Sequence, residues 1–297
     1  MGRVSTTGGF SNSNNDAFRA WVSEIISMLQ SAGLVRTADS GQIDEMTVNR
    51  PSSNSWAGSA IFRFNDALQA AAPVYLRLQF GTGASSTYPA LSVQIGTGSD
   101  GAGLLTGLVS QEHVMRANAS PGGGADYISR AVHTDGFAAL VYKIGASSSA
   151  TQILGVGFVV QRTVDNAGAP SPEGVMLITP PTGANSVTSN GVFSRIVYTS
   201  AVVPDPISTA WLGRVHGGLT DSRVGLSPQA FHHWIATPKL KPLAGTVGFI
   251  RGEVPTHSQF TLAMVGTVAR NYISVGPEMG NVLSASANSD MAILWED

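Results

Sequence analysis

The segment at residues 93–103, VQIGTGSDGAG, contains the pattern G-x-G-x-x-G directly after an alternating apolar run. In dinucleotide-binding folds this pattern joins a strand to a helix whose N-terminus receives the pyrophosphate, and an acidic residue follows on a second strand. Here Gly107 interrupts the next helix-length window, and the breaker cluster NASPGGGAD comes soon after it. The sequence therefore predicts a bend between two strands, with no nucleotide or other cofactor bound.

The histidines show no spacing that is typical of a metal site. His232 and His233 are adjacent, and His216 and Asp221 precede them. Neighbouring residues point about 100° apart on a helix and to opposite faces on a strand, so one segment does not present both imidazoles to a single ion. A packing or polar-surface role is favoured for these residues, and we predict no metal site.

Catalytic and sugar-binding patterns are weak. The adjacent carboxylates Asp44 and Glu45 do not face a common bond as glycosidase acids must, so a solvated linker is the simpler interpretation. The sequence has no G-x-S-x-G, no H-E-x-x-H and no Gly-Lys-Ser/Thr. We therefore expect that the protein is not an enzyme. Four tryptophans have side chains that could stack on sugars or, alternatively, anchor a core or an interface: Trp56, Trp211, Trp234 and Trp295.

The composition favours contacts with other proteins over contacts with nucleic acid. Charged residues make up 12% of the 297 residues, against about 25% in ordinary soluble domains. The net charge is -2 and no basic run occurs, so the electrostatic pattern of a nucleic-acid binder is missing. Arginine greatly outnumbers lysine, as at many interfaces, although a GC-rich genome has the same effect. The absence of cysteine excludes disulfides and thiol nucleophiles.

One amphipathic helix is predicted near the N-terminus. After SNSNND, which offers Asn and Asp as caps, Phe18, Trp21, Ile25 and Leu29 recur at three- and four-residue spacing, and Gly33 can end the helix. Such a face packs either on a β body or on a neighbouring subunit. The N-terminal residues show no apolar signal core, and no apolar run is long enough to span a bilayer, so we expect cytoplasmic synthesis without membrane insertion.

The rest of the chain predicts antiparallel sheets. Short alternating runs bounded by Gly, Pro, Asn and Ser begin after Pro51, as in SAIFRF, VYLRLQF, ALSVQI and FAALVYKI. The segment NDALQAAAP predicts one or two helical turns, capped by Asn65 or Asp66 and ended near Pro73, and SPQAFHHW predicts a short helix that begins at Pro228. The expected fold is mainly β: an antiparallel β-sandwich or barrel-like body at 51–297, with the helix and a linker at 1–50. A division into two packed sub-domains near 162–190 is one possibility.

At FNDALQAAAPVYLRLQFGTG, followed by YPALSVQIGTGSDGAG, the sequence resembles virion structural proteins of tailed bacteriophages. The resemblance covers residues 18–107 and carries no catalytic motif. It implies a β-rich homo-oligomer made in the infected bacterial cytoplasm and built into the tail, baseplate or head-to-tail region. The leading hypothesis is a virion structural subunit in the tail or baseplate. A carbohydrate-binding receptor-recognition module is the alternative, and a polysaccharide hydrolase is third.

Six residues are candidates for the interface with copies of the chain or with other virion proteins. Four belong to the apolar face of the helix: Phe18, Trp21, Ile25 and Leu29. We expect that face to dock on a partner, so that deleting residues 1–33 weakens assembly more than folding. Arg63 and Arg77 lie in alternating strands, with outward side chains that can donate hydrogen bonds to a neighbour; ordinary solvent exposure is the alternative for both.

Overall fold

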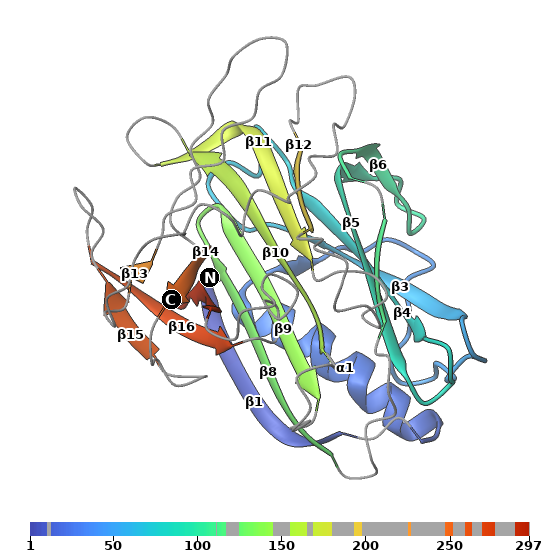
Figure 1. The fold of residues 1–297 in the computed structure, drawn as a ribbon. Helices are drawn as coiled ribbons and strands as arrows, with labels where there is room; N and C mark the ends of the chain where they lie inside the picture. Colours follow the sequence, from blue (N-terminus) through green and yellow to red (C-terminus); the bar gives the residue numbers. More distant parts are fainter. Residues whose placement is uncertain are drawn as a thin grey trace.

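The computed structural model describes residues 1–10, 13–110, 112–116, 125–144, 155–164, 169–179, 193–197, 225–226, 247–251, 259–262, 269–276 and 289–296. In these residues the chain forms three antiparallel sheets and one α-helix, α1 (Asn15–Ala32) (Figure 1). The expected mainly β fold with one helix near the N-terminus is confirmed, and the arrangement is sandwich-like. The predicted helix at SPQAFHHW lies outside the described residues.

Sheet A has the strand order β1-β8-β9-β10-β11-β12, in which β8 to β12 form a continuous meander. The N-terminal strand is added beside β8 and forms the border of the sheet (Figure 1). Because β10 pairs with β11 and β11 with β12, the possible sub-domain division near 162–190 falls inside one sheet. The strands are β1 (Gly2–Phe10), β8 (Ala125–Thr134), β9 (Phe137–Ile144), β10 (Gly155–Val164), β11 (Pro170–Thr179) and β12 (Phe193–Val197).

Sheet B has the order β2-β3-β4-β5-β6, and β7 also pairs with β5. The long strand β5 pairs with β7 along its first half and with β6 near its end. The predicted strands SAIFRF, VYLRLQF and ALSVQI therefore belong to a single sheet, as β3, β4 and β5. Its strands are β2 (Val35–Arg36), β3 (Trp56–Arg63), β4 (Tyr75–Thr82), β5 (Pro89–Ser99), β6 (Leu105–Leu108) and β7 (His113–Arg116).

A smaller sheet C is formed by C-terminal strands in the order β13-β14-β17-β16-β15. It lies beside the start of β1, where the Arg3 guanidinium donates to the Trp295 carbonyl at 2.8 Å (Figure 1). The chain passes from sheet A to sheet C between β12 and β13. The strands are β13 (Gly225–Leu226), β14 (Val247–Arg251), β15 (Gln259–Leu262), β16 (Arg270–Gly276) and β17 (Ser289–Leu294).

Helix α1 begins and ends where its capping residues predict. The Asn14 side chain accepts a hydrogen bond from the Ala17 amide at 2.9 Å, which satisfies one of the free N–H groups of the first turn. At the other end Gly33 has φ 109°, and its amide and that of Leu34 bond to carbonyls of the last turn. Glycine takes this left-handed conformation without a Cβ penalty, so the helix stops here.

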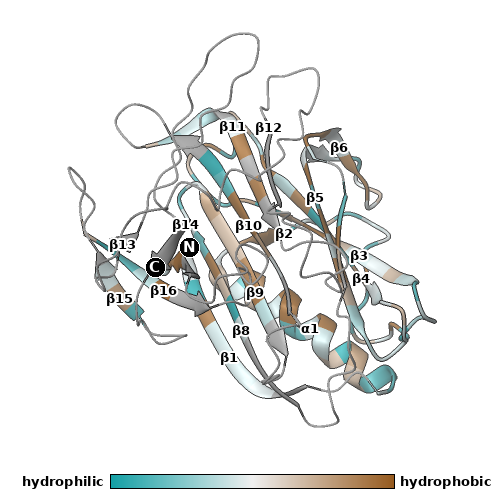
Figure 2. Cartoon of the chain, in the orientation of Figure 1, coloured by the Kyte–Doolittle hydropathy of each residue, from teal (hydrophilic) through white to brown (hydrophobic). Residues whose placement is uncertain are grey.

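The apolar face of α1 lies in the core between sheets A and B. Phe18 and Ile25 are 0% exposed and Trp21 is 2% exposed. They share one cluster with side chains of β3, β4 and β5 on one side and of β8, β9 and β10 on the other. The hydrophobic colouring of α1 is on its sheet-facing side (Figure 2). The residues of the 1–50 segment therefore have no separate core of their own.

The segment at 65–73 differs from its prediction. In place of a capped helix it forms successive turns, with Gln69 N bonding to Asp66 O at 3.2 Å and Ala72 N to Leu68 O at 2.8 Å. The Asp66 carboxylate does not cap these turns, because both of its oxygens bind Arg162 of β10. A charged partner on the other sheet has replaced a local hydrogen bond.

Candidate functional site

The glycine-rich segment is the hairpin between β5 and β6. Gly98 pairs with Thr106 in the ladder, and a strand follows the turn where a nucleotide fold has a helix. The Asp100 carboxylate accepts the amides of Ala102 and Leu104 at 2.7 and 3.0 Å, which closes the turn and holds the pKa of that carboxyl below its ordinary value. A Cβ on Gly98 would lie 2.7 Å from Thr106 Oγ1. The prediction of a bend between strands is confirmed, and close approach explains this glycine.

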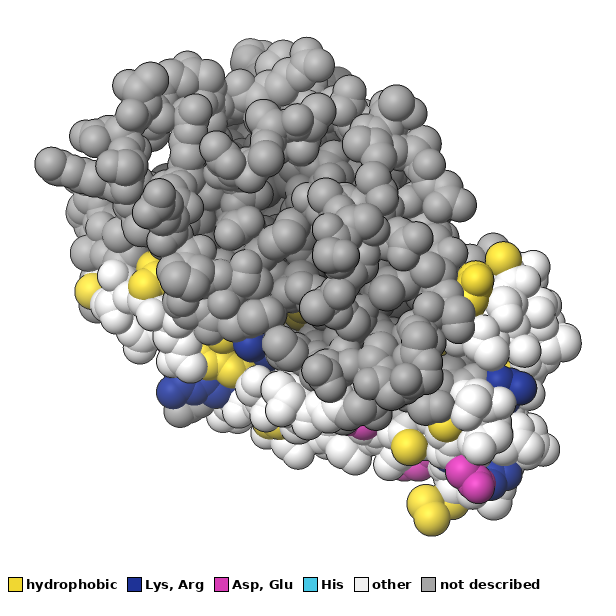
Figure 3. Space-filling view, turned by 60° about the horizontal axis from the view of Figure 1, so that its bottom comes forward, with side chains coloured by type: hydrophobic (Ala, Val, Ile, Leu, Met, Phe, Trp, Pro, Cys, Tyr) yellow, Lys and Arg dark blue, Asp and Glu magenta, His cyan; other side chains and the backbone are white. Residues whose placement is uncertain are grey.

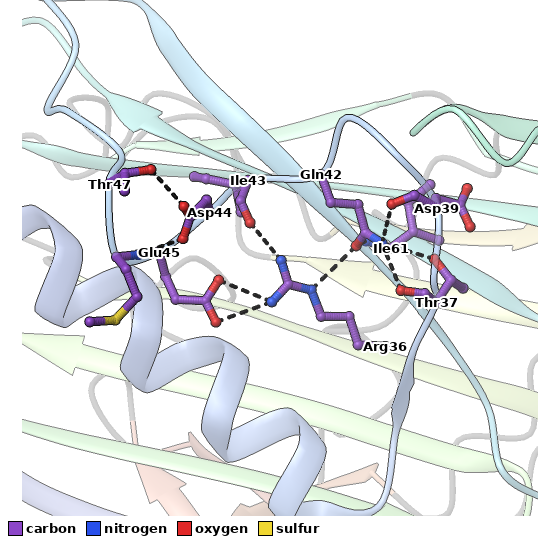
Figure 4. Close-up of polar contacts among 10 residues, drawn as sticks. Arg36, Thr37, Asp39, Gln42, Ile43, Asp44, Glu45, Thr47 and Ile61 are labelled. Carbon is purple, nitrogen blue, oxygen red and sulfur yellow. Dashed lines mark hydrogen bonds and ion pairs between the residues drawn. The ribbon is translucent and has the colours of Figure 1, made fainter.

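The linker after the helix is fixed to the edge of sheet B (Figure 4). The Arg36 guanidinium donates to both Glu45 oxygens at 3.0 and 3.1 Å and to the Ile43 carbonyl at 2.6 Å. The Gln42 side chain accepts the Ile61 amide of β3 at 2.8 Å and donates to the Thr37 carbonyl at 2.8 Å. The Gln42 side chain and the amides of Thr37 and Ile43 thus satisfy the edge of β3 where no described strand pairs with it.

The two adjacent carboxylates of this linker have separate partners. Asp44 accepts the Met46 amide at 3.0 Å and the Thr47 hydroxyl at 2.7 Å, and these bonds lower the pKa of its carboxyl. Glu45 is paired with Arg36. The two side chains serve a turn and an ion pair, so they do not converge on one substrate bond as a glycosidase pair would.

Glu24 holds the N-terminal strand against the helix. Its Oε1 accepts hydrogen bonds from the Thr6 hydroxyl of β1 at 2.6 Å and the Ser129 hydroxyl of β8 at 3.0 Å. The Tyr142 hydroxyl of β9 donates to Oε2 at 3.3 Å. One carboxylate of α1 thus joins three neighbouring strands of sheet A. The sequence gives no local sign of this cluster, because its members are 18 to 118 residues apart.

The most buried charged group links sheet B to sheet A. Asp66 and Arg162 are 0% and 1% exposed in their side chains, and their two N–O contacts measure 2.6 and 3.0 Å. Arg162 also donates to the Ala72 carbonyl at 2.7 Å. Every polar contact of this pair that the structure gives is made with other parts of the same fold, so the pair positions the 65–73 turns on β10.

His133 lies next to this ion pair. Its ring is 5.2 Å from the Phe64 ring in an edge-to-face arrangement, and its Nε2 accepts the Asn65 amide at 3.3 Å. Burial disfavours the charged imidazolium and lowers the pKa of His133 to about 4, although the Asp66 carboxylate acts in the opposite direction. The ring is therefore neutral at pH 7 and acts as a hydrogen-bond acceptor.

The expectation that the helical face is an interface is corrected by its burial. Phe18, Trp21, Ile25 and Leu29 fill the core of the same chain, and the Trp21 ring packs edge-on against Phe80 at 5.7 Å. The helical period shows that one face must be covered, but it does not distinguish a sheet of the same chain from a neighbouring subunit. The sequence also allowed the helix to pack on the β body of its own chain, and this is the packing observed.

The two candidate arginines lie on the face of sheet B that points away from the helix. Arg77 of β4 donates to the Ser59 hydroxyl of β3 at 3.2 Å, and both Arg63 and Arg77 are partly exposed. The sequence neighbours of both arginines point into the core: Phe62 and Phe64 beside Arg63, and Leu76 and Leu78 beside Arg77. The outward orientation is as expected, and a role in binding a neighbour stays a prediction.

Metal and sugar candidates receive no support from the described part of the chain. There, no group of three or more His, Asp or Glu side chains is placed to hold a metal ion. His113 is in β7 and is buried. Trp295 is buried and Trp56 is partly buried. The remaining candidates lie outside the described residues: Trp211, His216, Asp221, His232, His233 and Trp234.

Two strand edges form the main candidate surfaces for contact with another protein. In β1 the side chains alternate between partly buried and exposed, and only its β8 side is paired among the described strands. At the other sheet, β6 carries Leu108 and is preceded by Leu104, which are 52% and 55% exposed. The sequence reasoning missed β1; the β-branched residues Val4, Thr6 and Thr7 were the available signal.

The described surface carries few charges around these elements. In the view of Figure 3, a few basic and acidic groups lie among mostly uncharged ones over the part that is described, and one basic and one acidic group adjoin each other. No helix of the described chain is both long and apolar enough to cross a membrane. Comparison of the sequence with protein-family models and with curated proteins found no match.

Proposed function

We propose that the protein is a structural subunit of a tailed-phage virion, which assembles through contacts with copies of itself and with other virion proteins in the tail or baseplate region. The observation that supports this most is how the fold uses its charged groups. Glu24, Glu45 and Asp66 each hold one element of the sandwich to another. These contacts fix helix α1, the linker and the 65–73 turns to the sheets, and a repeated structural unit needs a body that keeps one shape.

The surface chemistry supports the same proposal. An unpaired strand edge presents free N–H and C=O groups that can bind another chain. A surface with few charges can be covered by a neighbour without the cost of burying many unpaired ammonium or carboxylate groups. The resemblance over residues 18–107 adds the virion context. On this proposal the protein is made in the bacterial cytoplasm, has no catalytic turnover, and binds no cofactor, no nucleotide and no specific nucleic-acid sequence.

The proposal is tested with the purified full chain and with phage particles. We expect mass photometry to show a homo-oligomer whose share rises with protein concentration, and mass spectrometry of particles purified from the phage that encodes the chain to detect it as a virion component. Glycan arrays and polysaccharide-cleavage assays serve as the contrasting measurements. A strict monomer that is absent from particles and binds a glycan saturably would replace the proposal by the receptor module, and cleavage would replace it by the hydrolase.

A further inference from the structure

The N-terminal strand β1 has the properties of an interface between two copies of the chain. It spans Gly2–Phe10 and contains no proline, so each residue offers both an N–H and a C=O. β8 uses one side of this ladder. Along the other side, no described strand forms a pair, and in Figure 1 this side is the outer border of sheet A, with sheet C beside the start of the strand. Natural proteins commonly protect such an edge with lysine, proline or a bulge, and β1 has none of the three.

The side chains of β1 leave this edge accessible and nearly uncharged. Ser5 and Thr7 are exposed, whereas Val4 and Thr6 turn toward the helix and sheet interior. The one charged residue, Arg3, is engaged with sheet C through the Trp295 carbonyl and ring. The strand is also held firmly, since Thr6 bonds to Glu24 and to Ser129. A partner therefore meets a preformed edge.

The sequence GRVSTTGGF is self-complementary when two copies run antiparallel about its central residue, Thr6. In that register Ser5 faces Thr7 of the second copy, and hydroxyl pairs of this kind stabilise neighbouring strands. Val4 faces a Gly8 and Arg3 faces a Gly9, so the larger side chains meet glycines and the two arginines do not meet each other. We propose that two copies of the protein pair through β1, antiparallel and centred on Thr6, so that sheet A continues from one copy into the other.

This inference deepens the proposed function, on which its biological meaning rests, by naming one contact between copies. The partner we infer is a second copy, because in this register the larger side chains of the strand meet glycines and no like charges face each other. Such a contact is isologous, with the same patch on both copies, and closes a two-fold pair. Contacts that extend a larger assembly then belong to other surfaces.

Cysteine cross-linking tests the register directly, because the natural chain contains no cysteine. We expect an equimolar mixture of the full-length variants Ser5→Cys and Thr7→Cys to form a disulfide-linked dimer on mild oxidation, with the linked peptides 5 and 7 identified by mass spectrometry. Each variant alone should cross-link much less, because like positions lie two residues out of register. Ser27→Cys, which is exposed on α1, is the matched control and should stay uncross-linked.

A charge test measures the contribution of the edge to self-association. In the Ser5→Lys/Thr7→Lys variant, lysines face one another in the pair, and we expect the dissociation constant to rise by at least about tenfold. The Ser27→Lys variant should leave it unchanged, and equal melting temperatures would show that both variants fold. If the double-lysine variant associates like the natural chain and the mixture gives no 5–7 linkage, the β1 inference is wrong while the proposed function stands.

The remaining outcomes also separate the two proposals. A natural chain that is monomeric at every concentration but is found in particles overturns the β1 pair alone. A monomer that is absent from particles overturns both. Cross-linking of 5 to 5 or of 7 to 7 in preference to 5–7 would overturn the register centred on Thr6, and with it the argument from self-complementarity.

Discussion

Replacing Arg162 by methionine should destabilise the fold strongly, because the Asp66 carboxylate would lose its buried partner. Arg162 makes two bonds to Asp66 at 2.6 and 3.0 Å and one to the Ala72 carbonyl at 2.7 Å. Methionine keeps much of the aliphatic volume but donates no hydrogen bond. Removing one partner of a buried ion pair costs about 3–5 kcal/mol. Because a whole domain is stable by about 5–15 kcal/mol, this is a large part of the total.

The assay is denaturant unfolding of the full chain at pH 7, followed by circular dichroism and tryptophan fluorescence. Arg270→Met is the matched control: Arg270 also pairs with a carboxylate, Glu296, but these side chains are 34% and 25% exposed. Exposed pairs contribute about 0–1 kcal/mol, so the control should change little. The second variant Asp66→Asn/Arg162→Met should recover part of the loss, since it removes the unpaired charge.

A loss of less than about 1 kcal/mol in Arg162→Met, equal to that in Arg270→Met, would refute the reasoning. It would mean that Asp66 reaches water or another cation in solution. The reasoning would also be refuted if the double variant were as unstable as the single one, because then the lost bond to Ala72, and not the unpaired charge, would account for the effect.

Three other changes have expected outcomes. His133 has a folded pKa of about 4 against 6.5 in the unfolded chain, so the unfolded state binds more protons between these pH values. The free energy of unfolding should be independent of this group above pH 6.5 and should fall by about 3 kcal/mol as the pH drops to 4. Urea titrations should show that His133→Gln loses most of this pH dependence. Ile25→Ala should lower the free energy of unfolding by about 2–5 kcal/mol, whereas Ser27→Ala on the exposed side of α1 should change the urea midpoint little. Equal urea midpoints for the two variants would mean that the apolar face of α1 is exposed to solvent. In Gly98→Val the new Cβ would clash with the Thr106 hydroxyl, so the melting temperature should fall by several degrees. Calorimetry of the natural chain with NAD, FAD and ATP should give no saturable heat. Micromolar binding of any of them that Gly98→Val abolishes would contradict the assignment of this segment as a simple hairpin.

The N-terminal deletion now has a different expected result from the one that the sequence suggested. Removing residues 1–33 takes away β1 and α1, and with them a large part of the core shared by sheets A and B. We expect the truncated chain to lose its cooperative thermal transition, measured by calorimetry. A truncated chain that melts cooperatively near the natural temperature but no longer associates would support the helical face as an interface after all.

Local patterns predicted those elements whose signals lie within a few residues of each other. Asn14 and Gly33 marked the ends of α1, and alternation in FAALVYKI predicted a strand that became β9. The weak alternation of GRVSTTGGF did not suffice for β1, because glycine and hydroxyl residues give little hydrophobic contrast between the faces of a strand. β1 is a strand because β8 and Glu24 hold it in place.

The sequence by itself determined that the chain is mainly β, that residues 15–32 form a helix with one apolar face, and that the segment after Val93 turns between two strands. Each of these follows from side-chain period or from a capping or turn residue, which act over a few residues. Only the tertiary structure decided which elements cover the apolar face of the helix and that Asp66 binds an arginine 96 residues away. It also decided that β1 forms one edge strand of sheet A. The physical reason is that the period of apolar residues shows only which face of an element must be buried, and a buried charged residue shows only that it needs a partner. Which distant face or partner is chosen depends on how the sheets pack.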